Sequence, residues 1–598
     1  MIKFPFKTKR KSQDKMIEEV KASIENQSNL LIHAPSGIGK SVASLYPAVK
    51  QALQKGLTVF FLTPRHSQHQ VALETLKKMG ITEVTDIIGK KWLCNYSYYN
   101  LDSREFQELC NYLKKEEKCR YYNKVYKIGD LTEEAKLKIE ELNNTLLNSE
   151  EIKTRCSELC AYEISCQLAK RSLVIVADYY HLFNPFVSYA FLSKINKKLE
   201  NSIIIVDEAH QLPGRARELL STKLTTFILR NAYKEARDCE SEVYNDIENL
   251  RLKLQELGDE KLKDVEESYI EKTELVRIIN SLGGDFLEEL QEISDLVKEA
   301  GKERSFCSSL LNFIEKWIDS DKDFARIIRR KEVKDKFEIK LASLLPSKIT
   351  SDIINNSYST ILMSATLQPL EMYADLLGVE NYRTVSFKPV FPRENRLNIV
   401  APIATTKYSK RGEKQYKTYA QVIENIFDKV NGNTAVFFPS YIFLKEVRNF
   451  LNNLEVFEES PELNKEQKSN ILNQFINSEK ALLLGVQGGS FDQGIDIPNN
   501  SLRCVIIAGL ALATPDLETR ALIDCYNKKY GRGMEYGYIF PAIQKAIQAS
   551  GRAIRSEKDR AVIVYLDERF LWRNYRRVLE GEDFVVSKEP WKEIEKFN

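Results

Sequence analysis

Short apolar runs alternate with longer amphipathic stretches in the first part of the chain. The first two runs are Leu30–Ile32 and Val59–Leu62, and the pattern resumes at Leu173–Val176, Ile203–Val206 and Thr360–Met363. Continuous apolar runs of this length are typical of parallel strands that are buried on both faces. Their alternation with helix-like stretches predicts βαβ units around a parallel sheet.

The same alternation returns from about residue 398 to the end of the chain. Its apolar runs are Ala435–Phe438, Ala481–Leu484, Val505–Ile507 and Ala561–Tyr565. The pattern therefore predicts two α/β halves, the first of which is interrupted twice.

Two segments of different character interrupt the first half. Residues 90–163 are rich in Lys, Arg, Tyr and Cys, whereas residues 214–345 contain no proline and many Glu, Lys and Leu residues. In the second segment, Phe286, Leu290, Ile293 and Val297 follow helical spacing. We therefore expect an all-helical insertion there.

Composition and charge fit a globular protein of several domains. The 598 residues are 43% hydrophobic and 29% charged. With 88 basic and 85 acidic side chains, the net charge is +3, so any nucleic-acid site must come from a local arrangement of cations. No secretory signal is visible, and the longest apolar run, Cys504–Ala513, is about half a membrane span. We expect a cytoplasmic location and no membrane partner.

A phosphate-binding loop follows the first predicted strand. The segment Ala34–Ser41 fits the pattern G-x-x-x-x-G-K-[ST], with Ala34 in place of the first glycine. In such a loop the main-chain N–H groups surround the phosphates, the lysine reaches the β- and γ-phosphates and the hydroxyl binds Mg²⁺. The candidate residues are Ser36, Gly37, Ile38, Gly39, Lys40 and Ser41. The alternative is an ordinary glycine-rich turn before a helix.

An acidic pair, Asp207 and Glu208, follows the strand Ile203–Val206. This position suits the carboxylate side of the same nucleotide site. Asp207 would hold Mg²⁺ through water, and Glu208 would orient or deprotonate the attacking water. A solvated strand end is the alternative interpretation.

The phosphate loop and Asp207-Glu208-Ala209-His210 together resemble superfamily 2 helicases of the D-E-A-H type. Further segments occur in that family's order: Arg10-x-x-Gln13, Thr63-Pro64-Arg65, Met363–Leu367, Phe437–Tyr441, Gly488–Asp496 and Gln548–Arg555. The resemblance implies two RecA-like lobes with ATP between them. It places Arg10 and Gln13 on the adenine side, and Gly494 and Asp496 at the nucleotide.

Gln548, Arg552 and Arg555 stand at i, i+4 and i+7 spacing, which predicts one face of a helix. Arginines carried from the second lobe would make hydrolysis conditional on closure of the lobes, and an arginine finger is worth about 10³–10⁵ in rate. A solvated helix face is the alternative.

Six of the ten cysteines lie close together: Cys94, Cys110, Cys119, Cys156, Cys160 and Cys166. In a long chain without a secretory signal, such clustering indicates a metal or cluster site rather than disulfides. Zinc sites usually contain close cysteine pairs, and here only Cys156 and Cys160 form one. A 4Fe–4S cluster needs four thiolates and tolerates long loops between them.

The position of these cysteines resembles the XPD family of iron–sulfur DNA helicases. The matching contexts are Gly89–Cys94, Cys119–Asn123, Cys160–Glu163 and Ala177–Phe183. The resemblance implies a 4Fe–4S cluster on Cys94, Cys110, Cys119 and Cys160. Ala161 replaces the family's proline, and Cys156 and Cys166 remain rivals of Cys160 as fourth ligand.

Cations and aromatic residues interleave in residues 90–126, as in single-strand binding surfaces. They are Lys90, Lys91, Trp92, Tyr96, Tyr98, Tyr99, Arg104, Lys114, Lys115, Arg120, Tyr121, Tyr122, Lys124 and Tyr126. The alternative is a solvated face with core tyrosines. By resemblance, single-stranded DNA threads a hole between the iron–sulfur domain, a helical Arch domain and the first lobe, and the protein is a monomer.

The resulting division is first lobe 1–89, 164–213 and 346–397; iron–sulfur domain 90–163; Arch domain 214–345; second lobe 398–598. The expected function is an ATP-dependent 5′–3′ DNA helicase that acts on single-stranded and forked DNA, by resemblance in nucleotide-excision repair. The alternatives are a DinG- or FancJ-like helicase for R-loops or DNA secondary structure, a DNA-bubble-binding cluster protein and a redox sensor. No protein partner can be named.

Overall fold

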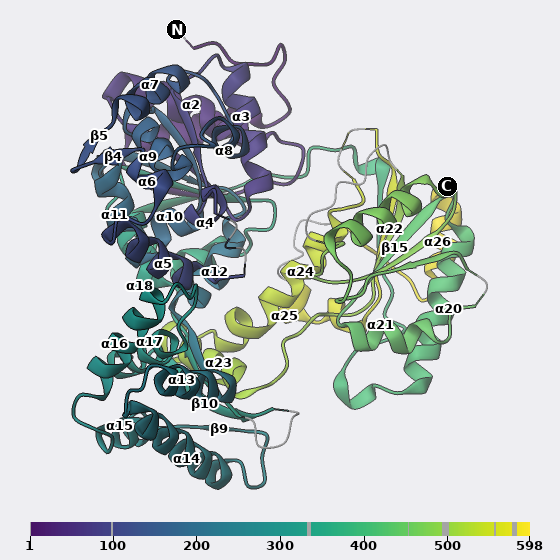
Figure 1. Ribbon diagram of the computed structural model, residues 1–598. Helices are drawn as coiled ribbons and strands as arrows, with labels where there is room; N and C mark the ends of the chain where they lie inside the picture. The colour runs from purple at the N-terminus through teal and green to yellow at the C-terminus, as the bar shows by residue number, and fades with distance from the viewer. Residues whose placement is uncertain are drawn as a thin grey trace.

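A computed structural model gives the fold. It describes residues 2–96, 98, 100–331, 337–452, 454–492, 501–554, 556, 558–576 and 583–598. Two seven-stranded sheets form two separate α/β bodies, and a four-stranded sheet lies in a third part of the molecule (Figure 1). Across the described part of the chain, no helix is both long and apolar enough to cross a membrane.

The sheet of the first lobe has the order β13-β1-β12-β7-β2-β6-β3, and all its strand pairs are parallel. Its strands are β1 (Asn29–His33), β2 (Thr58–Thr63), β3 (Val84–Ile87), β6 (Val174–Asp178), β7 (Ser202–Val206), β12 (Ser359–Ser364) and β13 (Tyr382–Ser386). The five strands predicted for this half are confirmed. Because β1, β12 and β7 are neighbours, their carboxyl ends meet at one edge of the sheet.

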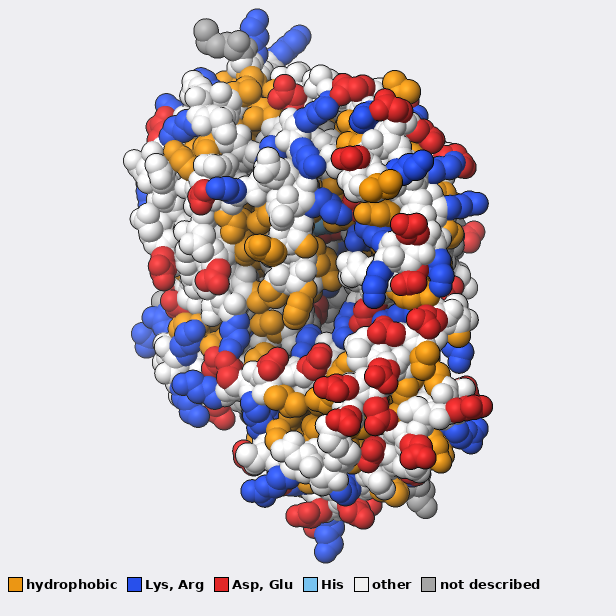
Figure 2. Space-filling view, turned by 60° about the vertical axis from the view of Figure 1, so that its left-hand side comes forward, with side chains coloured by type: hydrophobic (Ala, Val, Ile, Leu, Met, Phe, Trp, Pro, Cys, Tyr) orange, Lys and Arg blue, Asp and Glu red, His pale blue; other side chains and the backbone are white. Residues whose placement is uncertain are grey.

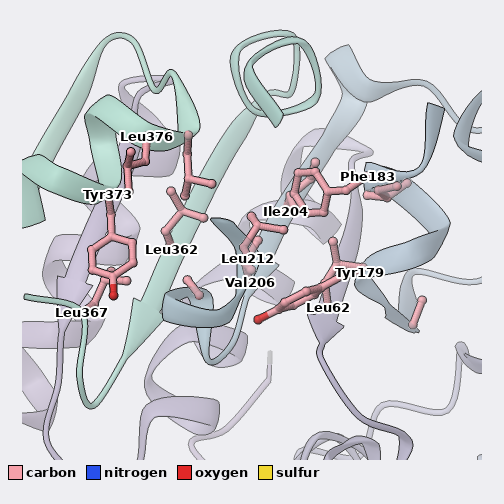
Figure 3. Close-up of a cluster of buried hydrophobic side chains, with 14 of the residues drawn as sticks. Leu62, Tyr179, Phe183, Ile204, Val206, Leu212, Leu362, Leu367, Tyr373 and Leu376 are labelled. Carbon is pink, nitrogen blue, oxygen red and sulfur yellow. The ribbon is translucent and has the colours of Figure 1, made fainter. Parts of the chain in front are cut away.

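Helices cover both faces of this sheet. On one face lie α1 (Gln13–Glu25), α2 (Lys40–Lys55) and α3 (His69–Lys78), whose core includes Leu30 and Phe61. The other face carries α10 (Tyr179–Phe183), α11 (Pro185–Lys194), α12 (Leu212–Leu220), α18 (Ser347–Asn355) and α19 (Leu370–Leu377). Figure 3 shows Leu62, Val206 and Leu362 of three neighbouring strands in this second core. Burial on both faces explains why the strands are continuously apolar.

The second lobe repeats this architecture with the strand order β16-β17-β15-β18-β19-β14-β20, again with parallel pairs throughout. Its strands are β14 (Arg396–Val400), β15 (Asn433–Phe438), β16 (Val456–Glu458), β17 (Leu482–Val486), β18 (Leu502–Ile507), β19 (Ala561–Tyr565) and β20 (Val585–Val586). Its helices are α20 (Glu413–Lys429), α21 (Tyr441–Arg448), α22 (Lys465–Asn477), α23 (Leu517–Tyr530), α24 (Phe540–Ser550), α25 (Arg573–Arg576) and α26 (Pro590–Phe597). The four predicted strands are confirmed.

Residues 90–163, the cysteine segment, form short helices against the first lobe. They are α4 (Lys90–Leu93), α5 (Ser103–Lys115), α6 (Arg120–Asn123), α7 (Glu133–Leu142), α8 (Ser149–Arg155) and the start of α9 (Ala161–Arg171), with a small hairpin of β4 (Tyr126–Lys127) and β5 (Asp130–Leu131). Most of its buried residues belong to the core of the first lobe, while Leu101, Phe106 and Leu109 form a separate small cluster beside Cys94 and Cys110.

Residues 214–345, the Arch segment, are not all-helical, so that prediction is wrong. The described residues of this segment contain most of α12 and five further helices: α13 (Thr226–Asp238), α14 (Val243–Lys261), α15 (Lys272–Asn280), α16 (Phe286–Glu299) and α17 (Phe306–Asp319). The predicted stripe of α16 is buried. An antiparallel sheet of order β8-β11-β10-β9 accompanies the helices, with β8 (Thr222–Thr225), β9 (Glu267–Tyr269), β10 (Phe324–Arg330) and β11 (Phe337–Ser343). Its strands hold Ile327, Ile328 and Ile339, whose β-branched side chains favour strands.

Candidate active site and cysteine cluster

The phosphate-binding loop joins β1 to α2 at the carboxyl edge of the first sheet. Gly37 and Gly39 have φ angles of 94° and 82°, which residues with a Cβ adopt only under strain. The loop ends where Lys40 begins α2. The helix therefore directs its N-terminal N–H groups and the positive end of its dipole into the site.

Arg10 and Gln13 support this loop from outside. The Gln13 side-chain amide donates a hydrogen bond to the main-chain oxygen of Ile38 at 2.9 Å, and Arg10 Nη1 donates to the oxygen of Gly37 at 2.7 Å. Gln13 is 2% exposed, and a Cβ at Gly39 would lie 2.4 Å from its Nε2 atom. Both residues thus lie against the loop, and their contact with adenine stays a prediction.

The acidic pair stands at the end of β7, beside the ends of β1 and β12. Ser364, the last residue of β12, donates a hydrogen bond to Glu208 Oε2 at 3.0 Å. His210 Nδ1 lies 2.8 Å from Ser364 Oγ and 3.3 Å from Glu208 Oε2. The Tyr179 hydroxyl donates to the main-chain oxygen of Asp207. Glu208 is therefore held by polar groups from two strand ends.

The two carboxyl groups have opposite pKa shifts. Burial raises the pKa of Asp207, and the neighbouring charge of Glu208 raises it further. Burial also acts to raise the pKa of Glu208, but the hydrogen bond with His210 and the charge of Lys40 outweigh it and lower this pKa below its usual value. Glu208 therefore stays ionised at neutral pH, as a group that orients water or accepts a proton must.

Arg552 lies on the second-lobe side of this site. Burial lowers the pKa of its guanidinium, while the carboxylates of Asp492 and Glu208 oppose that shift. An arginine remains charged in proteins, so Arg552 brings a positive charge within electrostatic range of Glu208. Arg65 of the first lobe is similarly within range of Asp492 of the second lobe.

The predicted common helix face of Gln548 and Arg552 is wrong. Helix α24 ends at Ser550, so Gln548 lies on the helix and Arg552 lies in the turn after it. Arg555 falls outside the described residues, as do Gly494 and Asp496. Sequence reasoning missed Gln544, whose side-chain amide donates to the main-chain oxygens of Thr366 at 3.3 Å and Gln368 at 3.1 Å in the first lobe. Its position one helical turn before Gln548 was the available signal.

Four of the cysteines form a group. Cys94 follows α4, Cys110 lies in α5, Cys119 precedes α6 and Cys160 precedes α9. Burial raises the pKa of the thiols of Cys94, Cys119 and Cys160, and the nearby Cys110 raises each further. Burial also raises the pKa of Cys156, but there the charged neighbours are Lys138 and Glu141. Cys110 is thus an electrostatic neighbour of Cys160, whereas the neighbours that shift the pKa of Cys156 are a lysine and a glutamate.

The surroundings of these four sulfurs fit thiolate ligands. Main-chain N–H groups lie near three of the sulfurs and partly offset the rise in pKa that burial causes. The N–H of Tyr96 acts on Cys94, the N–H groups of Tyr121 and Tyr122 act on Cys119, and the N–H of Glu163 acts on Cys160. Within the described residues, no three His, Cys, Asp or Glu side chains are arranged to hold one metal ion. This criterion for a single ion does not apply to a 4Fe–4S cubane. In a cubane each thiolate binds a different iron, so the four ligands stand farther apart than the ligands of one ion.

A buried carboxylate beside Cys160 joins this group to the first lobe. Glu163 is fully buried, and its oxygens lie 2.5 Å from Lys114 Nζ of α5 and 2.7 Å from Lys194 Nζ of α11. The Lys90 ammonium lies 5.1 Å from the ring centre of Tyr162. Positive charge thus surrounds one side of the cysteine group, which suits a site that carries negative charge when its thiols are ionised.

The aromatic residues of the cysteine segment divide between core and surface. Tyr121 is buried and makes an edge contact with Tyr96 at 4.9 Å, whereas Trp92 is 46% exposed. Tyr122 lies under Lys114, whose Nζ is 4.3 Å from the ring centre. Tyr99 is outside the described residues. Figure 2 shows a hollow near the middle of one face, with Lys and Arg side chains on one side of it and hydrophobic side chains on the other.

Comparison with known proteins finds two helicase domain families in the chain. The DEAD_2 family matches residues 61–229, and the helicase C-terminal domain family matches residues 423–582. ATP-dependent DNA helicase XPD of Sulfolobus acidocaldarius is 24% identical over 93% of this chain and 95% of its own length. The XPD/RAD3 helicase subunit of the general transcription and DNA repair factor IIH of Saccharomyces cerevisiae is 21% identical over 95% of this chain and 87% of its own length.

Solved structures agree at the level of the fold. An XPD helicase structure superposes with a TM-score of 0.69 at 22% identity and covers 97% of this chain and 100% of its own. S. tokodaii Xpd4 gives a TM-score of 0.65 at 18% identity, with coverage of 97% and 100%. Two RecA-like lobes with this nucleotide cleft, together with the two matching domain families, define a helicase. The relatives that this chain resembles along nearly its whole length are XPD proteins.

Proposed function

We propose that this protein is an ATP-dependent DNA helicase that moves 5′ to 3′ along single-stranded DNA and separates forked duplexes. One observation carries the proposal: Glu208 lies within electrostatic range of both Lys40 of the first lobe and Arg552 of the second. Such a site hydrolyses a nucleotide efficiently only when the lobes close on it. The similarity to XPD proteins along nearly the whole chain favours this role over a DinG-like one, since the Staphylococcus aureus 3′-5′ exonuclease DinG matches 39% of the chain.

In this proposal the chain's own residues perform hydrolysis. The loop from Ser36 to Gly39 and the Lys40 ammonium bind the phosphates, and Arg10 and Gln13 lie toward the base. Glu208, held by Ser364 and His210, orients the attacking water and accepts its proton. From the second lobe, Arg552 stabilises the charge that develops on the phosphate oxygens, and Gln548, Arg555, Gly494 and Asp496 complete that side.

Two inorganic groups complete the proposal. Ser41 and Asp207 would hold Mg²⁺, which neutralises phosphate charge. Cys94, Cys110, Cys119 and Cys160 would hold a 4Fe–4S cluster, which would fix four segments of the chain to one another. The cysteine segment, thus stiffened, would face the duplex junction, where opening costs about 1.4 kcal/mol per base-pair step in lost stacking.

The test of the helicase function is an unwinding assay with two forked substrates. One substrate carries a single-stranded 5′ tail and the other a 3′ tail, and ATP hydrolysis is measured with and without single-stranded DNA. We expect DNA-stimulated hydrolysis and unwinding of the 5′-tailed fork. Unwinding of the 3′-tailed fork alone would refute the polarity, and binding without hydrolysis would refute the helicase function in favour of a DNA-bubble-binding protein.

The fourth cluster ligand is tested by a matched pair of variants, Cys160→Ser and Cys156→Ser. We expect anaerobically purified wild-type protein to contain about four irons per chain and to absorb visible light. Cys160→Ser should lose most iron and unwinding, because it removes a member of the cysteine group, whereas Cys156→Ser should keep both. The reverse result would assign the ligand to Cys156, and a colourless wild-type protein that unwinds DNA normally would refute the cluster.

A further inference from the structure

A helical hairpin of the second lobe contacts both the Arch segment and the first lobe. It consists of α23, a π-helical segment η6 (Glu535–Ile539) and α24. In Figure 1 α23 and α24 lie in the region between the body of the second lobe and the parts formed by the first lobe and the Arch segment. Its start, its bend and its end each make a different set of contacts.

The start of the hairpin is bound by the sheet of the Arch segment. The main-chain N–H of Leu517 donates to Glu267 Oε1 of β9 at 2.6 Å, and the Tyr269 hydroxyl donates to the main-chain oxygen of Leu517 at 2.8 Å. Because Leu517 is the first residue of α23, the Glu267 carboxylate stands at the positive end of the helix dipole.

Two cations of the same sheet also bind the start of the hairpin. Arg329 Nη2 of β10 lies 3.2 Å from Glu267 Oε2 and 3.5 Å from Asp516 Oδ2. Lys340 of β11 pairs with Glu518 of α23. All these charged side chains are partly buried, between 23% and 28% exposed. Ion pairs with this degree of burial are screened less by salt than fully exposed ones.

The two arms of the hairpin are in close contact beside its bend. A Cβ at Gly533 would lie 2.1 Å from the main-chain oxygen of Ile523, and one at Gly537 would lie 3.3 Å from the Ile523 side chain. The two arms therefore approach as closely as glycine permits, and densely packed elements transmit displacement rather than absorb it.

The bend and the end of the hairpin touch the first lobe beside the catalytic groups. Near the bend, the hydroxyls of Tyr530 and Tyr536 donate to the main-chain and side-chain oxygens of Asp375, both at 2.9 Å. Farther along, Gln544 donates to the oxygen of Thr366, two residues after the Ser364 that holds Glu208. The chain then continues to Arg552.

We propose that Glu267, Arg329 and Lys340 are positioning residues for ATP hydrolysis. They fix the start of the hairpin, and the rigid hairpin then sets Gln544 and Arg552 relative to Glu208. A displacement of the Arch segment, such as entry of a DNA strand beside it, would thereby alter the rate of hydrolysis. The inference rests on the proposed helicase function. It adds a structural connection, through the hairpin, between the Arch segment and the catalytic cleft.

The test is a charge reversal and its rescue. Lys340→Glu and Glu518→Lys, each alone, should lower kcat for DNA-stimulated ATP hydrolysis by about 2- to 30-fold, the range that couplings of this kind cover, while KM for ATP stays near that of the wild type. The double variant should recover the wild-type kcat because it restores the pair with reversed sign. Tyr269→Phe, which loses one hydroxyl, should show a smaller loss of kcat.

The control is Arg251→Glu, which breaks a comparable ion pair with Glu248 inside α14 of the same Arch segment. It should leave kcat unchanged. Equal losses in the control and in Lys340→Glu, or a double variant as impaired as the single ones, would overturn the inference. Wild-type protein that hydrolyses ATP while both single variants keep full kcat would overturn it and leave the helicase function standing, whereas inactive wild-type protein would refute the helicase function itself.

Discussion

At the scale of single residues, the proposed mechanism depends on how Glu208 is held. Glu208 has a φ angle of 51°, an uncommon conformation for a residue with a side chain, and its carboxylate is fixed by Ser364 and His210. These partners come from β12 and from the turn after β7. A carboxylate oriented in this way loses little freedom when it meets water and phosphate, and such preorganisation is a main source of catalysis.

Glu208→Gln tests this arrangement. The amide keeps the size of the side chain and can still accept the hydrogen bond from Ser364, but it carries no charge and accepts no proton. We expect kcat for ATP hydrolysis to fall by about 10²–10⁴-fold, with nucleotide binding preserved when measured with a fluorescent ATP analogue. Glu218→Gln, which changes an exposed carboxylate of α12 that pairs with Arg215, is the control and should stay active. A Glu208→Gln variant near wild-type activity would remove Glu208 from the mechanism.

At the scale of elements, Glu163 joins three helices. It lies in the first turn of α9, and its partners Lys114 and Lys194 lie on α5 and α11. Burial raises the pKa of Glu163, yet the two lysines outweigh burial and lower it. The carboxylate is therefore ionised, and it links the cysteine segment to the first lobe.

Glu163→Gln should weaken this connection. Removing one partner of a buried ion pair leaves charge without compensation and typically costs about 3–5 kcal/mol; here the lysines reach solvent, so the cost should be near or below the lower end of that range. Limited proteolysis of the cysteine segment and the thermal midpoint measure the effect. The matched control, Glu158→Gln, breaks an exposed pair with Lys124 in the same segment and should change little. Equal effects would show that Glu163 has no special role.

The elements also show which features the sequence determines locally. Strands such as β7 were predictable because burial on both faces makes them continuously apolar. The Arch sheet was missed because its strands lie within a segment whose composition favours helices, although the alternation of apolar and charged residues at the start of β11 was an available strand signal. The fourth cysteine could not be chosen from spacing, since the distance between Cys160 and Cys110 depends on how α5 and α9 pack. By contrast, the end of α24 before Arg552 did carry a sequence signal, because Gly551 follows the last helical residue directly.

At the scale of the whole molecule, the polar contacts between the described parts of the two lobes include some that lie beside Glu208 and its partner Ser364. Gln544 contacts the turn after β12, and Arg552 stands within range of Glu208. A cleft with contributions from both lobes links hydrolysis to their relative position, because each half alone lacks part of the charge that stabilises the transition state. The proposed mechanism therefore couples movement of the lobes to hydrolysis.

Arg552→Ala tests that coupling directly. The variant should still bind ATP, because the phosphate loop lies entirely in the first lobe, but hydrolysis should fall by about 10³–10⁵-fold, as when an arginine finger is removed. It should also fail to respond to single-stranded DNA, since closure of the lobes would no longer bring a cation to the γ-phosphate. Arg448→Ala is the control, because this second-lobe arginine pairs with Glu458 instead. If Arg552→Ala kept DNA-stimulated hydrolysis, the second lobe would not complete the active site, and the link between lobe movement and hydrolysis would have to lie elsewhere.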